Sequence, residues 1–85
     1  MNEIQWATKA VRQLRKFPVT VQQQVFTGVA RLSDWPQVQN VKKLKNRDDY
    51  RLRVGDYRVF FTVHPDGTVT VIRIEEVKKR DEHTY

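Results

Sequence analysis

The segment from Asp49 to Phe61 constrains the fold more than any other part of the chain. Apolar and polar side chains alternate from Tyr50 to Val54, a Gly-Asp pair follows, and a second apolar run begins at Tyr57. Strict alternation indicates a β-strand with one buried face, and glycine is the residue that a tight turn requires. The segment therefore predicts a β-hairpin.

The predicted hairpin brings three arginines to one face. Because side chains alternate along a strand, Arg51 and Arg53 point away from the face that their apolar neighbours occupy. Arg58 lies just past the turn, close to both of them across the hairpin. Guanidinium groups offer a planar set of donors that matches phosphate oxygens. The hairpin therefore predicts a surface that binds phosphate.

Length, charge and composition limit the class of protein. The chain has 85 residues, with 16 Lys plus Arg, 10 Asp plus Glu, a formal net charge of +6 and no cysteine. The length predicts one domain over residues 1–85, and the lack of cysteine excludes disulfides and cysteine-ligated metals. A net positive charge favours nucleic acid, an anionic membrane or an acidic protein as partner. No signal peptide or membrane span is recognisable, so we expect a cytoplasmic protein without membrane contact.

The rest of the chain predicts a two-layer α+β domain in the order β-α-α-β-β-β. Strands are expected over residues 2–6, 49–54, 57–63 and 68–75. Helices are expected over residues 7–17 and from Thr20, where a capping box opens the second helix, to 33–36. Residues 37–46 predict a loop, and residues 64–67 predict a turn. A mostly antiparallel sheet would carry the two-helix hairpin on one face and leave the arginine face open.

The residues suited to proton transfer are few. His64 and His83 are too few and too far apart to form a metal site, and we expect no metal and no cofactor. Cleavage of RNA needs a base for the 2′-OH, an acid for the leaving oxygen and stabilisation of the phosphorane charge. Arginine stabilises charge but stays protonated, so other groups must carry protons. The candidates are His83, Tyr85, Lys78 and Lys79.

Two neighbouring glutamates and one phenylalanine also bear on the site. Glu75 and Glu76 are adjacent in a predicted strand, so we expect them on opposite faces, as surface charges or as partners of an arginine. Phe60 is expected near Arg58, where its ring could stack on a base.

The hairpin motif at 50–59, the preceding residues 41–45 and the tail from Lys79 to Tyr85 resemble the RelE/ParE superfamily of bacterial toxins. These toxins belong to type II toxin–antitoxin systems. The resemblance covers nearly the whole chain and implies the β-α-α-β-β-β fold. It also implies a neutralising antitoxin as partner, through which the complex binds its own operator DNA.

Within this superfamily, RelE-like members cleave mRNA, usually on the ribosome, whereas ParE-like members poison DNA gyrase. The basic positions and the terminal tyrosine of this chain resemble the RelE-like members. The implied catalytic residues are Arg51, Arg53, Arg58, Arg80, His83 and Tyr85. Looser contacts to the RNA backbone are expected from Lys42, Lys43, Lys45 and Lys79.

The chain departs from RelE at two of these positions, because RelE has lysines where Arg51 and Arg53 stand. A lysine can transfer a proton and an arginine cannot, so the role of general base is expected to move to His83 or Tyr85. From the resemblance to the RelE-like members we expect a ribosome-dependent mRNA endoribonuclease that inhibits translation, with the 2′-OH attacking the adjacent phosphate. The alternatives are a ParE-like gyrase inhibitor without nuclease activity and a nucleic-acid binder without catalysis.

Overall fold

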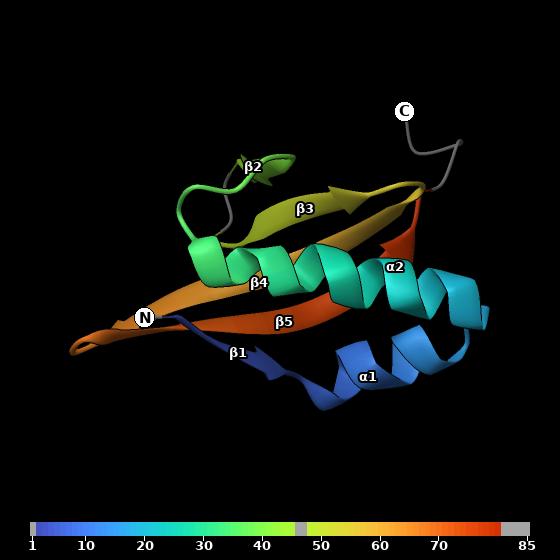
Figure 1. Cartoon of the computed structure of the whole chain (residues 1–85), viewed down its shortest axis with the longest axis horizontal. Coiled ribbons are helices and arrows are strands. Elements are labelled where there is room, and N and C mark those ends of the chain that lie inside the picture. Colours follow the sequence, from blue (N-terminus) through green and yellow to red (C-terminus); the bar gives the residue numbers. More distant parts are fainter. Residues whose placement is uncertain (1, 46–47, 81–85) are drawn as a thin grey trace.

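The computed structural model describes residues 2–45 and 48–80, which form a sheet and a helical layer (Figure 1). The elements in chain order are β1 (Asn2–Trp6), α1 (Thr8–Arg15), α2 (Val19–Ala30), the 3-10 helix η1 (Arg31–Asp34), β2 (Val41–Lys43), β3 (Tyr50–Val54), β4 (Tyr57–Asp66) and β5 (Val69–Lys79). The strand order is β1-β5-β4-β3-β2, with β1 parallel to β5 and all other pairs antiparallel. The predicted α+β class with a mostly antiparallel sheet is confirmed.

One face of the sheet and both helices share a single hydrophobic core. α1 lies along β5, and α2 crosses β3 and β4, in front of the sheet in Figure 1. Apolar side chains from all of these elements meet there because each element has one apolar face. The buried core residues are Ala10, Leu14, Val25, Val29, Leu32, Leu52, Val59, Phe61, Ile72, Ile74 and Val77. The helices therefore cover this face and leave the opposite face of β3 and β4 open.

α1 takes the place of a strand partner along part of β5. β1 ends at Trp6, which pairs with Ile74, whereas β5 continues to Lys79. Beyond that point the backbone N–H of Val77 donates a hydrogen bond of 2.7 Å to Oε1 of Gln13 in α1. A buried backbone donor needs such an acceptor, because an unpaired one costs free energy. The side chain of Gln13 therefore fixes α1 against the edge of the sheet.

Two local expectations are wrong for identifiable reasons. Residues 37–46 are not only a loop, because they contain the short strand β2, in which Val41 pairs with Leu52. The sheet thus has one strand more than expected. The capping box at Thr20 does not form, because α2 begins directly after Pro18 and has no side-chain cap. Pro18 has the extended backbone of an N-cap, so Thr20 is already inside the helix.

The turn expected at residues 64–67 lies further along the chain. β4 continues through Pro65, which pairs with Thr70, to Asp66. Proline is tolerated there because the pairing of β4 with β3 ends at Phe61, so this arm of β4 has only β5 beside it. The hairpin instead turns at Gly67, whose φ of 63° favours glycine.

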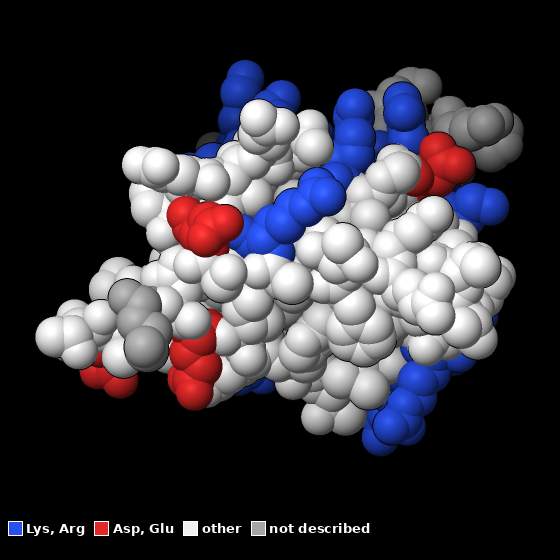
Figure 2. Space-filling view, in the orientation of Figure 1, with Lys and Arg blue, Asp and Glu red and all other residues white. Residues whose placement is uncertain are grey.

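The side of the molecule that shows α2 carries little charge. Figure 2 shows mostly uncharged surface over α2, with basic side chains along the border near β2 and β3. α2 itself contains no charged residue, and two of its apolar side chains, Val19 and Phe26, are 66% and 52% exposed. Among the described residues, no helix has the length and hydropathy needed to span a bilayer.

Candidate functional site

A row of three cations crosses the open face of the sheet. Strand register places Arg53 of β3 opposite Arg58 of β4, and Arg58 opposite Lys78 of β5. We call Arg53, Arg58 and Lys78 the cationic row. Neighbouring strands are about 4.8 Å apart, so the three side chains start close together. Like charges directly opposite each other destabilise a sheet, and an anion bound over the row would relieve this repulsion.

A second row lies beside the cationic row on the same face. In this row Lys42 of β2 pairs with Arg51, Arg51 pairs with Phe60, and Phe60 pairs with Glu76. Phe60 is half-buried, and the Nζ of Lys78 lies 5.9 Å from its ring centroid. An aromatic face beside cations is the combination that binds single-stranded nucleic acid, since bases stack on the ring and phosphates meet the charges. Phe60 lies next to Arg58 on this face, as expected, because the two residues are two positions apart in β4.

A β-bulge brings both glutamates of β5 to the open face. Glu76 pairs with Phe60, but Ile74 pairs with the next residue of β4, so Glu75 is an extra residue without a partner in the ladder. Thr62 on the open face donates a 2.9 Å hydrogen bond to Oε2 of Glu75. The expectation that the two carboxylates point to opposite faces is wrong, because the extra residue interrupts the alternation.

Glu76 is held by lysines from two elements. Its Oε1 lies 2.6 Å from Nζ of Lys9 in α1 and 3.7 Å from Nζ of Lys78 in β5, and its side chain is 16% exposed. A hollow of about 550 Å³ opens next to it. The hollow is lined by Ala7, Thr8, Lys9, Asp49, Thr62, Arg73, Glu75 and Glu76. The open face therefore passes from cations at the Arg53 end to carboxylates around this hollow.

Two arginines of the rows remain available to a ligand. Among the described residues, no carboxylate forms an ion pair with Arg51 or Arg53. Arg51 is half-buried and Arg53 is exposed. Within residues 2–45 and 48–80 no group of three potential metal ligands occurs. The geometry of the open face is thus suited to an anion such as phosphate.

The basic residues at the end of β5 differ in the face that they occupy. Lys79 pairs with Tyr57, whose ring contacts Phe17 of the helical layer at 4.9 Å between centroids. Lys79 is therefore on the helix side of the sheet. Arg80 is exposed, and its backbone N–H donates a 2.7 Å hydrogen bond to the carbonyl of Asp56. That bond keeps Arg80 beside the turn between β3 and β4.

The remaining sequence candidates are only partly placed by the structure. Lys42 belongs to the open face, whereas Lys43 pairs with Tyr50 on the helix side. Lys45 is exposed beyond the end of β2. His83 and Tyr85 lie outside the described residues.

Lys78 lies opposite Arg58 on the open face, whereas the tail motif indicates its neighbours Lys79 and Arg80 as site residues. The sequence contains a signal for this position of Lys78. Val77 is the last apolar residue of the strand and is buried, and the residue next to a buried one in a strand faces away from the core. The same rule places Glu76, which precedes Val77, whereas the bulge at Glu75 is what alternation could not predict.

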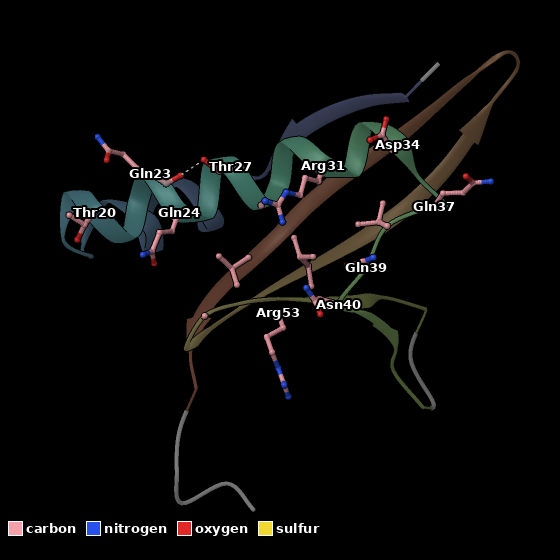
Figure 3. A pocket seen from close by; sticks show the side chains of 15 residues that line it. Thr20, Gln23, Gln24, Thr27, Arg31, Asp34, Gln37, Gln39, Asn40 and Arg53 are labelled. Carbon is pink, nitrogen blue, oxygen red and sulfur yellow. Dashed lines mark hydrogen bonds between the residues drawn. The ribbon is translucent and has the colours of Figure 1, made fainter.

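A separate groove of about 970 Å³ lies between α2 and the edge of β3 (Figure 3). Polar side chains such as Gln23, Gln24 and Asn40 line it, together with the charged residues Arg31, Asp34 and Arg53. The side chain of Arg53 extends from β3 away from α2 in Figure 3. Arg53 is one of the residues that line this groove, and the groove therefore reaches the edge of β3 that carries one end of the cationic row.

The fold and its cationic face define a small basic α+β protein whose uncovered sheet face carries a row of cations. The sequence pattern of the family described as "ParE toxin of type II toxin-antitoxin system, parDE" matches residues 4–80. The chain belongs to this family and is a toxin of the RelE/ParE superfamily of type II toxin–antitoxin systems. The resemblance noted in the sequence is therefore confirmed.

Solved structures agree with this assignment. The isolated Escherichia coli RelE toxin is similar with a TM-score of 0.76 and 20% identity, covering 94% of this chain and 85% of that chain. The RelBE2 toxin–antitoxin complex of Mycobacterium tuberculosis is similar with a TM-score of 0.76 and 26% identity, covering 92% of this chain and 96% of that chain. The RelE–RelB complex of Pyrococcus horikoshii is similar with a TM-score of 0.75 and 26% identity, covering 95% of this chain and 97% of that chain. No curated protein matches by sequence.

Proposed function

We propose that this toxin is an endoribonuclease that cleaves mRNA, on the ribosome, and thereby inhibits translation. The observation that carries the proposal is the cationic row of Arg53, Arg58 and Lys78 on an open sheet face, with Phe60 beside it. A nuclease needs positive charge fixed where the phosphorane develops, and three cations held in register by a sheet supply it in advance. A gyrase inhibitor would need no such arrangement.

In this proposal the 2′-OH attacks the adjacent phosphate and leaves a 2′,3′-cyclic phosphate or a 3′-phosphate end. Arg53 and Arg58 hold the phosphate oxygens, and Arg51 contacts the same nucleotide from the second row. Arg80 adds charge from the end of β5, while His83 and Tyr85 carry protons or position the base. Of the four lysines expected to contact the RNA backbone, Lys42 lies on the open face and Lys45 is exposed beyond β2. Lys43 and Lys79 lie on the helix side and would meet only RNA that passes the edge of the sheet.

The description of the matched family favours a second candidate, a gyrase inhibitor of the ParE type without nuclease activity. The two functions predict different damage in the cell. Expression of the toxin should stop protein synthesis and produce mRNA cut at defined positions, which primer extension maps. Arg58→Ala should weaken these cuts by about 10²- to 10³-fold. Double-strand DNA breaks with intact mRNA would instead support the gyrase inhibitor, and intact mRNA and DNA with RNA bound would support a binder without catalysis.

We further propose that a cognate antitoxin neutralises the toxin and links it to its operator DNA. Two of the similar structures are complexes with a RelB antitoxin. On this chain, α2 carries no charged residue and exposes the apolar side chain of Phe26, on the helix side of the sheet and opposite the face that carries the cationic row. Phe26→Asp should weaken capture of the antitoxin encoded beside the toxin gene and leave RNA cleavage intact. Unchanged capture would place the antitoxin elsewhere.

A further inference from the structure

We propose that Glu76 and Lys78 are the acid–base pair of the RNA cleavage. Glu76 takes the proton of the attacking 2′-OH, and Lys78 gives a proton to the leaving 5′-oxygen. This inference rests on the proposed nuclease function and deepens it. In this mechanism His83 and Tyr85 position the nucleobase of the RNA.

The reaction needs proton carriers that the arginines cannot supply. The cationic row and its neighbour Arg51 offer guanidinium groups, which stay protonated and can only stabilise charge. A base and an acid must lie within reach of the nucleophile and the leaving group, each contributing about 10²- to 10⁴-fold to the rate. Strand register puts the ammonium group of Lys78 directly opposite Arg58, and the carboxylate of Glu76 lies two residues earlier in β5, opposite Phe60.

The positions of these two residues suit the two ends of the reacting phosphate. Lys78 is directly opposite Arg58, and Glu76 is directly opposite Phe60, one step along the same face. Two positions along a strand place their Cα atoms about 6.6 Å apart. A phosphate held by Arg58 would therefore have the carboxylate toward one apical oxygen and the ammonium toward the other. The base of the same nucleotide would lie over the ring of Phe60.

Contacts from outside β5 hold the carboxylate in place. The Nζ of Lys9 in α1 lies 2.6 Å from Oε1 of Glu76, and the carboxylate is 16% exposed. Lys78 is 55% exposed, and its Nζ is 3.7 Å from the same oxygen. The general base Glu76 is thus fixed by the fold, whereas the general acid Lys78 can move toward an incoming phosphate. The charged groups around Glu76 are Lys9, Asp49, Arg58, Arg73, Glu75 and Lys78.

The proposed step balances without a metal or a co-reactant. As the 2′-oxygen bonds to phosphorus, its proton passes to the carboxylate of Glu76. The bond between phosphorus and the 5′-oxygen breaks, and that oxygen takes a proton from the ammonium group of Lys78. The products are a 2′,3′-cyclic phosphate and a 5′-hydroxyl. A proton then returns from Glu76 to Lys78 across their contact, which restores both charges.

The test compares cleavage rates on two versions of one mRNA substrate, with oxygen or sulfur as the 5′-bridging atom at the cleaved position. Glu76→Gln should lose about 10²- to 10⁴-fold on both versions, and the acidic limb of its pH–rate profile should disappear. Lys78→Met should lose a similar factor on the oxygen version. On the sulfur version it should recover to within about tenfold of wild type, because a thiolate leaves without a proton.

The matched control is Glu75→Gln, which removes the neighbouring carboxylate and should keep the rate within about threefold of wild type. Full activity of Glu76→Gln, or an equal loss by Lys78→Met on both substrates, would overturn the inference while the nuclease function stands. If wild type leaves both substrates intact on the ribosome and in free solution, the nuclease function fails as well. Should Glu76→Gln not fold, the sulfur rescue of Lys78→Met still decides.

Discussion

Gly28 tests how tightly α2 packs on the strand that carries two of the arginines. A Cβ atom built on Gly28 would lie 2.7 Å from Cγ2 of Val54, at the end of β3. Val54 is β-branched, so its methyl groups have few other positions available. Replacing a helical glycine by alanine gains about 1 kcal/mol, but overpacking of a close contact costs about 1–3 kcal/mol. Gly28→Ala should therefore lower the free energy of unfolding by about 1 kcal/mol.

The assay is a double-mutant cycle with Val54→Ala, measured by urea unfolding. In the Val54→Ala background the colliding methyl groups are gone, so Gly28→Ala should raise the free energy of unfolding by about 1 kcal/mol. The coupling between the two sites should then be about 2 kcal/mol, and each kcal/mol should shift the melting temperature by about 4–8 °C. If Gly28→Ala is equally stabilising in both backgrounds, α2 and β3 do not approach as closely as described.

Three further predictions test the edge of β5, the hairpin turn and the cationic row. Gln13→Ala should lower the free energy of unfolding by about 1–3 kcal/mol, because Val77 N–H loses its acceptor; an unchanged urea midpoint would contradict this role. Gly55→Ala should cost about 1 kcal/mol by the same measurement, since a φ of 56° strains any residue with a Cβ, and a neutral effect would refute that strain. Arg53→Ala should reduce the slope of log affinity for RNA against log salt by about one, and an unchanged slope would remove Arg53 from the phosphate contacts.

The hairpin and the arginine face could be predicted from sequence because alternation is regular there. From Tyr50 to Phe61 each residue on one strand has one partner on the next, so counting by two places Arg51, Arg53 and Arg58 correctly. The same counting fails in β5. An extra residue at Glu75 changes the parity, and a single bulge has no sequence signature as strong as a turn.

Other parts of the fold depend on contacts that a local pattern does not contain. β2 spans only Val41–Lys43 and is too short to show periodicity, so its pairing with β3 is what makes it a strand. Proline and Asp-Gly near residue 65 resemble a turn, yet the absence of β3 beside that arm lets β4 continue. The hydrogen bond from Val77 to Gln13 joins distant segments and could not be predicted from either one.

We propose that charge on the open face, rather than basic charge in general, serves RNA cleavage. The most direct test measures single-turnover cleavage of mRNA by Arg58→Ala and by Arg15→Ala, which removes the same charge from an exposed position on α1 outside both rows. Arg58→Ala should lose about 10²- to 10³-fold in rate, and Arg15→Ala should stay within about threefold of wild type. Equal losses in the two variants, or no loss in Arg58→Ala, would contradict the account.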